Sequence, residues 1–202
     1  MITVSHLTVI SFNVKFMKKV IDFKKIKWVN KPKRCIQESH KLVLETEPHT
    51  SLNLLGGSAE AVELQIKPKG NFCFSIRTDF EYKKTFDQCG IILYDSNGRK
   101  VICGCEKMDG EVSKLVCRVY HIDGTDRSER EIGSAIQWMY YRIWLRGGIV
   151  RIQYSFNGER YSDLREFATQ DSDLNIGIYA CSLKDSSFDC IFSEAILNEE
   201  GE

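Results

Sequence analysis

The chain has 202 residues, of which 43% are hydrophobic and only 3 are proline, enough for one domain that buries roughly 70% of the surface of its unfolded chain. Lysine plus arginine and aspartate plus glutamate each number 28, so the formal net charge is zero. No global positive field exists to hold DNA or RNA through counterion release, and nucleic-acid binding is not expected. No apolar run approaches the ~18 residues of a membrane span, so we expect a soluble protein.

The two ends of the chain carry opposite charges. Residues 1–40 hold nine Lys or Arg against Asp22 and Glu38, whereas residues 159–202 hold three basic and eleven acidic side chains. Either the ends pair with one another or they form an interaction surface. Met17 is a plausible native start, so we expect an extension over 1–16, one domain over 17–198 and an acidic tail over 199–202. No secretion signal is recognisable, which favours a cytoplasmic protein.

The cysteines also favour the cytoplasm. All eight occur singly, mostly inside apolar runs typical of strands, and buried free thiols in a reducing compartment explain this distribution better than disulfides do. Cys103 and Cys105, with His121 downstream, resemble a metal site most, but they lack the paired spacing of zinc ligands. We therefore expect no metal and no cofactor.

Strand patterns dominate nearly the whole chain. Apolar and polar residues alternate with period two, which places every second side chain on the same face of a strand. The apolar sets that we expect to face a core are Leu42, Leu44 and Thr46; Val62, Leu64 and Ile66; and Phe72, Phe74, Ile76, Thr78 and Phe80.

Four dipeptides have the composition of two-residue hairpin turns, because each can supply the positive φ that such turns require. About a dozen strands with short connections predict an all-β fold, an antiparallel two-sheet β-sandwich of the jelly-roll type. The segment 163–169 is the one stretch where we expect a helical turn. The four dipeptides are Asn97-Gly98, Asp109-Gly110, Gly147-Gly148 and Asn157-Gly158.

The first two turns predict which residues meet. With two-residue loops, Glu106 lies opposite Cys89 on one side and Ser113 on the other, and Asp87 lies on the same face as Glu106, diagonal to it and within ~7–8 Å. Two carboxylates at this separation suit the acid and nucleophile of a retaining glycosidase, acceptors for sugar hydroxyls, or part of a cation site. The alternative is a structural cluster in which Gln88 and Ser113 donate to Glu106, and Asp87 caps the loop at Thr85.

The turn at Gly147-Gly148 predicts two contrasting faces. The core face contains Tyr141, Ile143, Leu145, Val150, Ile152 and Tyr154, continued by Tyr161 through the next turn. The opposite face either binds sugars or acidic glycans, through indole stacking and donors from Arg and Gln, or is a solvent-facing surface with a cation–π contact between Trp144 and Arg151. Its residues are Arg142, Trp144, Arg146, Arg151, Gln153, Ser155 and Arg160.

Other catalytic signatures do not occur in the sequence. It has no GxSxG elbow, HExxH motif, P-loop or phosphate-binding GxGxxG. His40, His49 and His121 are expected to be ordinary surface or loop residues. Nucleophilic catalysis therefore has no positive support.

A series of short motifs resembles a poorly characterised bacterial and fungal domain family of the concanavalin A-like lectin/glucanase superfamily, sometimes labelled as regulating enolase. The resemblance covers residues 20 to 197. Arg127 stands where the family usually has tryptophan, and the ExDxxE signature of the superfamily's glucanases is absent. The motifs are Ile26–Pro32, Phe86–Ile91, Cys103–Glu106, Asp126–Ser128, Tyr141–Ile143, Tyr154–Glu159, Leu164–Phe167 and Ile176–Ser182.

The resemblance implies a concanavalin A-like sandwich and a site around its Asp-Gln-x-Gly and Gly-x-Glu elements, here Asp87, Gln88, Gly90, Gly104 and Glu106. We predict a lectin-like module that binds carbohydrate without catalysis. The alternatives are a glycoside-processing enzyme using Asp87 and Glu106, and a protein-interaction module using the charged termini. The sequence does not predict the oligomeric state. The candidate ligand-binding residues are Asp87, Gln88, Glu106, Asp126, Arg142, Trp144 and Arg151.

Overall fold

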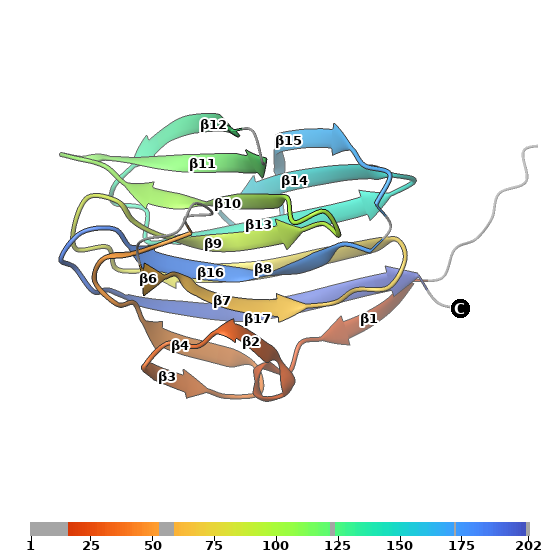
Figure 1. The fold of residues 1–202 in the computed structure, drawn as a ribbon, viewed down its shortest axis with the longest axis horizontal. Coiled ribbons are helices and arrows are strands. Elements are labelled where there is room, and N and C mark those ends of the chain that lie inside the picture. The colour runs from red at the N-terminus through yellow and green to blue at the C-terminus, as the bar shows by residue number, and fades with distance from the viewer. Residues whose placement is uncertain (1–15, 53–58, 122–123, 172, 201–202) are drawn as a thin grey trace, which may run out of the picture.

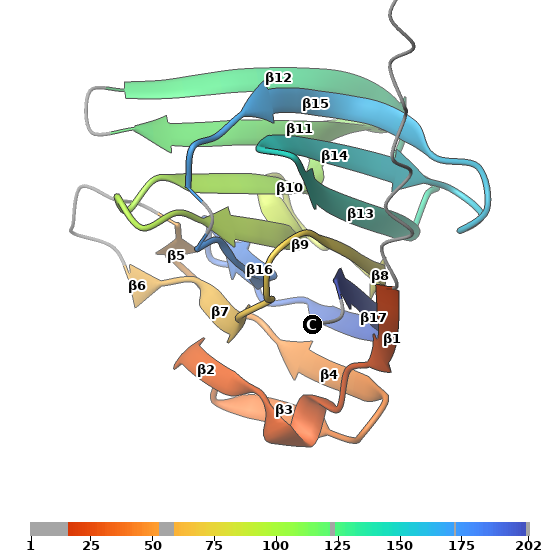
Figure 2. The ribbon, with the colours of Figure 1, turned by 90° about the vertical axis from the view of Figure 1, so that its right-hand side faces the viewer.

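The computed structural model describes residues 16–52, 59–121, 124–171 and 173–200. Figures 1 and 2 show two large sheets packed face to face. Every pairing within these two sheets is antiparallel, and the described part of the chain contains a single short 3-10 turn, η1 (Phe23–Lys25). The predicted all-β antiparallel sandwich is confirmed.

The first sheet has eight strands and the second has seven. A parallel pair, β5 (Thr50–Ser51) with β6 (Ala59–Glu60), lies apart from both. The first sheet runs in the order β15 (Ser162–Ala168), β14 (Ile149–Ser155), β13 (Trp138–Arg146), β8 (Phe72–Phe80), β17 (Asp189–Glu200), β4 (Lys41–Glu45) and β3 (Arg34–Gln37), with β1 (Phe16–Val20) also paired to β17. The second runs β12 (Gly124–Gly133), β11 (Val112–His121), β10 (Lys100–Lys107), β9 (Asp87–Tyr94), β16 (Asn175–Ser182), β7 (Val62–Ile66) and β2 (Lys27–Asn30).

The core between the sheets is formed by the residues that the alternation predicts. Phe72, Phe74 and Ile76 are at most 1% exposed, because every second side chain of β8 points toward the other sheet. The predicted apolar sets of β4 and β7 also point into this core. All eight cysteines lie in the described part of the chain and are free, seven of them buried.

The hairpin between β13 and β14 has the predicted register. Gly147 and Gly148 both have positive φ, 55° and 75°, and this two-residue turn places Trp144 opposite Arg151. Consequently the predicted core face of this hairpin, from Tyr141 to Tyr154, is buried.

The registers predicted at Asn97-Gly98 and Asp109-Gly110 are wrong by one residue. Glu106 lies opposite Gln88 and Lys114, not opposite Cys89 and Ser113. At the first turn, the Asp95 carboxylate accepts hydrogen bonds from the backbone N–H groups of Asn97 and Arg99, so the loop has three residues instead of two. A one-residue slip moves every side chain of a strand to the other face.

Two further predictions around β15 are wrong. The Asn157-Gly158 turn belongs to a longer loop, because Tyr154 pairs with Ser162 instead of Tyr161. Ser155 and Asn157 accept several backbone hydrogen bonds within this loop and thereby stabilise the wider turn. The segment expected to form a helical turn is strand β15, whose polar residues pair with β14.

The first and last described strands pair through their backbones. Strand β1 pairs with the end of β17, which extends to Glu200 and so includes the first two residues of the predicted tail. The ion pairs of the basic N-terminal region involve Asp22, Glu45 and Glu47, so within the described residues no ion pair joins the two charged ends. Residues 1–15 and 201–202 lie outside the described part. None of the helical structure described is long and apolar enough to cross a membrane.

Candidate functional site

The seven predicted site residues are distributed over three places. Gln88 and Glu106 lie side by side on the outer face of the second sheet, whereas Asp87 lies on the other face of β9, together with the core residue Cys89. Asp126 lies on the edge strand β12. Arg142, Trp144 and Arg151 lie on the outer face of the first sheet.

Glu106 is the centre of a closed ionic network. The Arg118 Nη2 atom donates to both carboxylate oxygens of Glu106 at 2.9 Å, and Arg127 Nη2 donates to Oε2 at 2.9 Å. The Glu106 side chain is only 3% exposed. Burial lowers the pKa of Arg118, but the charge and hydrogen bonds of Glu106 outweigh it and the pKa is raised. We call Gln88, Glu106, Arg118 and Arg127 the Glu106 cluster.

Two glycines of the family motifs explain why other side chains can cover the outer face of the second sheet beside this cluster. Gly90 and Gly104 lie opposite each other on β9 and β10. A Cβ atom on Gly104 would lie 2.5 Å from the hydroxyl of Tyr179, and one on Gly90 would lie 2.1 Å from the carbonyl oxygen of Cys103. Gly104 therefore leaves room for the Tyr179 hydroxyl, and Gly90 allows the close approach of the β10 backbone. A small apolar cluster covers this region, formed by Leu52, Ala61, Ile92, Ile102, Tyr179 and Cys181.

Asp87 has a structural role in the loop before β9. Its Oδ2 atom accepts hydrogen bonds from the backbone N–H groups of Lys83 and Lys84, both at 2.9 Å, and from Ser186 Oγ at 3.0 Å. It is fully buried. Asp87 and Glu106 therefore point to opposite faces of one sheet, and the geometry that the sequence suggested for a shared catalytic or ligand-binding site is wrong.

Asp126 connects the edges of the two sheets. Its carboxylate accepts a hydrogen bond from Arg165 of β15, whose other Nη atom donates to Ser128 at 3.0 Å. This hydrogen bond holds the pKa of Asp126 below its ordinary value. Strand β12 is thereby attached to β15 across the open side of the sandwich.

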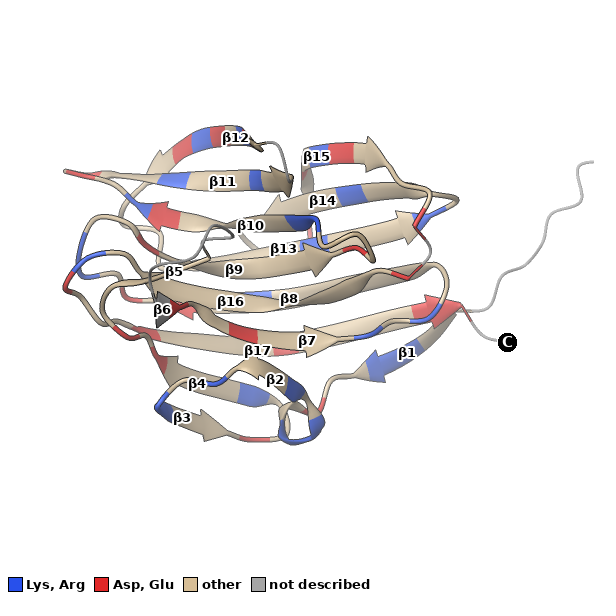
Figure 3. Cartoon of the chain, in the orientation of Figure 1, with Lys and Arg blue, Asp and Glu red and all other residues tan. Residues whose placement is uncertain are grey.

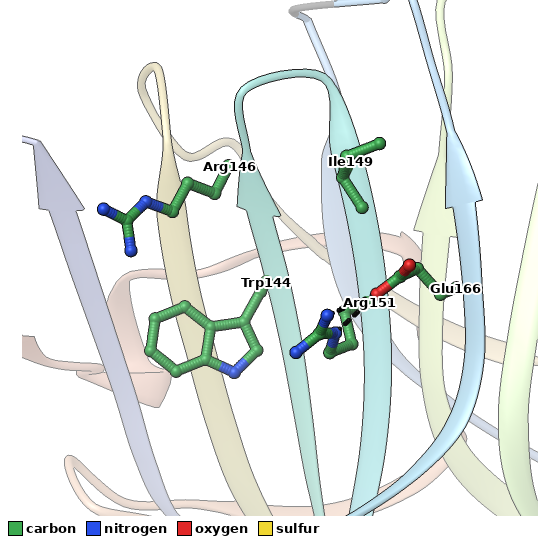
Figure 4. Close-up of a pocket in the computed structure, with 5 residues that line it drawn as sticks. All are labelled: Trp144, Arg146, Ile149, Arg151 and Glu166. Carbon is green, nitrogen blue, oxygen red and sulfur yellow. Dashed lines mark hydrogen bonds and ion pairs between the residues drawn. The ribbon is translucent and has the colours of Figure 1, made fainter.

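The outer face of the first sheet contains an open hollow of about 420 Å³. Trp144 is half-buried, whereas Arg146, Ile149, Arg151 and Glu166 are exposed. Arg151 Nε donates to Glu166 Oε2 at 2.7 Å. Figure 4 shows the indole and the two guanidinium groups around this hollow, which we call the Trp144 pocket. It is lined by Trp144, Arg146, Ile149, Arg151 and Glu166.

A buried amide fixes the indole. The Oε1 atom of Gln153 accepts hydrogen bonds from Trp144 Nε1 at 3.0 Å and from Arg142 Nε at 2.8 Å, while its amide nitrogen donates to Asp163 at 2.6 Å. The Arg142 guanidinium carbon lies 5.2 Å from the ring centroid of Trp144 and 3.7 Å from that of Tyr161. The cation–π partner of Trp144 is therefore Arg142, and the predicted contact with Arg151 is wrong.

Sequence reasoning missed Arg118 and Glu166. Both follow from strand pairing, since Arg118 lies opposite Arg127 on β11 and β12, and Glu166 lies opposite Arg151 on β14 and β15. In the sequence, the alternating charges of β12 indicate a strand, and its pairing with β11 places Arg127 beside Arg118. In the described ranges, no three His, Cys, Asp or Glu side chains converge to hold a metal ion.

Comparison with known proteins identifies the fold class. A crystal structure of a functionally unknown protein from Saccharomyces cerevisiae superposes with a TM-score of 0.77 and 25% identity, covering 90% of this chain and 100% of that one. The catalytic domain of an endo-1,3-beta-glucanase (laminarinase) from Thermotoga petrophila gives 0.61 at 8% identity, with 94% and 100% coverage. The chain is a concanavalin A-like sandwich.

Sequence comparison then identifies the family. The chain belongs to the DUF1349 family, described as a protein of unknown function, whose model matches residues 28–200. It is 27% identical to Regulation of enolase protein 1 of Saccharomyces cerevisiae over an alignment of 173 residues. The alignment covers 83% of this chain and 86% of that protein. The family resemblance predicted from the motifs is thereby confirmed.

Proposed function

We propose that the protein is a cytoplasmic, lectin-like module that binds carbohydrate in the Trp144 pocket without catalysis. The observation that carries the proposal is a half-buried indole that lines an open hollow, beside an exposed ion pair whose polar atoms are within reach of a ligand. An aromatic face packs against the axial C–H groups of a pyranose, and Arg and Glu side chains bond to its hydroxyls.

The side chains that hold the Trp144 indole in place favour carbohydrate binding. Because Gln153 and Arg142 hold the Trp144 ring in one orientation, little side-chain freedom is lost when a ligand binds. Arg146 makes no ion pair with another described residue, so its guanidinium is available to a sugar hydroxyl or a uronic acid carboxylate. The glucanase neighbour supports the proposal by analogy, because it has the same fold.

A panel of neutral and uronic-acid-bearing oligosaccharides tests the proposal by isothermal titration. We expect saturable binding of at least one member, weakened on the order of 30-fold by Trp144→Ala, since a buried aromatic anchor contributes about 2 kcal/mol or more. Trp138→Ala is the matched control, because Trp138 lies on the same face of β13 and is 43% exposed, but does not line the Trp144 pocket. Equal weakening by both variants contradicts the assignment.

Hydrolysis of the same oligosaccharides is measured in parallel. We expect no reducing ends above the protein-free rate. Turnover above that rate would contradict a purely binding role, and Trp144→Ala would then show whether the turnover depends on the Trp144 pocket.

A further inference from the structure

A second hollow lies at the other end of the sandwich from the Trp144 pocket. Trp144 lies opposite Cys73 at the start of β8, whereas this hollow begins at Lys83, just beyond the end of β8. It measures about 290 Å³ and is formed by three loops, those between β8 and β9, β10 and β11, and β16 and β17. Figure 3 shows basic residues on the loops at this left-hand end of the molecule.

Four lysines line this hollow, with Asp109 as the one acidic residue among the lining side chains. Within the described residues, none of the four forms an ion pair with a carboxylate. The Asp109 carboxylate already accepts a hydrogen bond from Thr85 Oγ1 at 2.5 Å. Like charges gathered in one hollow repel one another unless an anion lies among them. We call Lys83, Lys84, Lys107 and Lys184 the lysine hollow.

The three loops are tied together before any ligand binds. The buried Asp87 carboxylate joins the first loop to Ser186 of the third, and Lys84 Nζ donates to the carbonyl oxygen of Asp185 at 2.8 Å. The backbone N–H of Phe86 donates to the carbonyl oxygen of Lys107 at 2.8 Å. These bonds position lysines that are far apart in sequence around one space.

The backbone conformation of Phe86 also indicates that these loops are held in place. Phe86 has φ of 72°, an uncommon conformation for a bulky residue that persists only where the surroundings impose it. Lys184 Nζ lies 5.1 Å from the Phe86 ring centroid, so this strained residue contacts one of the four lysines directly. The first and third loops are thus held in a single arrangement.

We propose that the lysine hollow binds the tetrahedral oxyanion of a phosphate or sulfate ester. Lysine ammonium groups bind such oxyanions as point charges that adapt to the anion. The hollow has the volume of several water molecules, which accommodates the oxyanion and part of the group that carries it. This site is separate from the proposed carbohydrate site and does not depend on it.

The test is titration with inorganic phosphate and inorganic sulfate at constant ionic strength, monitored by backbone amide NMR. We expect saturable shifts confined to residues 83–86, 107–110 and 184–186. Glucose 6-phosphate and glucose 6-sulfate then distinguish the two esters, since the proposal requires saturable binding of at least one. Absence of saturation, or shifts spread over all basic surfaces, would overturn the proposal.

A charge-matched pair of double variants sharpens the test. Lys107→Gln with Lys184→Gln is expected to weaken phosphate binding at least tenfold. Lys19→Gln with Lys27→Gln removes the same charge from a different lysine-lined groove and is expected to leave binding unchanged. Equal losses would mean that only net charge matters and would overturn the site. Trp144→Ala is expected to leave phosphate binding intact, so failure of the carbohydrate proposal is distinguishable from failure here.

Discussion

The Glu106 cluster and the Trp144 pocket contain similar side chains, yet the fold uses them differently. Each places arginines beside a glutamate and an aromatic ring on the outer face of a sheet. The Glu106 side chain is 3% exposed and bound by two arginines, whereas Arg151 and Glu166 are 47% and 49% exposed. A buried ionic group must satisfy its bonds within the protein, while an exposed pair remains available to a ligand. Burial, more than residue type, therefore separates a structural network from a candidate site.

The same substitution in both places gives the largest expected difference. Glu106→Gln leaves Arg118 without its anionic partner, while Arg127 keeps only its pair with Glu129, and is expected to lower the free energy of unfolding by about 3–5 kcal/mol. Glu166→Gln is expected to cost no more than about 1 kcal/mol, because an exposed pair is screened by water. Urea unfolding measures both, and similar losses would contradict the comparison.

Removal of the aromatic rings gives a second contrast. Tyr179 is 1% exposed, so Tyr179→Ala is expected to lower the free energy of unfolding by about 3–5 kcal/mol. Trp144 is half-buried, and Trp144→Ala is expected to cost clearly less, about 1–2 kcal/mol, while carbohydrate binding is lost. If the two losses are equal, the Trp144 ring has a structural role.

The reactivity of two cysteine thiols also distinguishes the Trp144 pocket from the Glu106 cluster. Burial raises the pKa of Cys73, opposite Trp144, to about 11, and raises the pKa of Cys181, beside Gln88, further. Because the thiolate is the reactive form, Cys73 is expected to react with a thiol reagent before Cys181, and Trp144→Ala is expected to accelerate only Cys73. Mass spectrometry of labelled peptides measures the order, and the denatured chain should yield eight thiols.

The smallest expected effect concerns Asp126, which belongs to neither region. Its hydrogen bond from Arg165 lowers the pKa of Asp126 below its ordinary value of 3.8. A lowered folded-state pKa contributes stability that is present above the unfolded-state value and is lost as the pH falls through the folded-state value. Asp126→Asn is therefore expected to destabilise the protein slightly at pH 7 and not at all well below pH 3.8, as measured by urea unfolding.

The period-two alternation predicted the inward faces of β4, β7 and β8, and together with the closely spaced turns it predicted the sandwich. It did so because the strand period is fixed by backbone geometry, whatever the partners are. The register of β13 with β14 was also predictable, since a Gly-Gly pair supplies positive φ at both positions of a two-residue turn. Trp144 and Arg151 were therefore correctly placed on one outer face.

The register around Glu106 depends on side chains that lie outside the turn dipeptides. Asp95 widens the turn before β10 by binding backbone N–H groups, and this single residue separates Asp87 from Glu106 by placing them on opposite faces. Arg118 reaches Glu106 through the pairing of β10 with β11, and Arg127 reaches it through the further pairing of β11 with β12. Local sequence determined which residues face inward along each strand, whereas the pairing of strands determined which charges meet, because an ion pair depends on distances between strands that no local pattern sets.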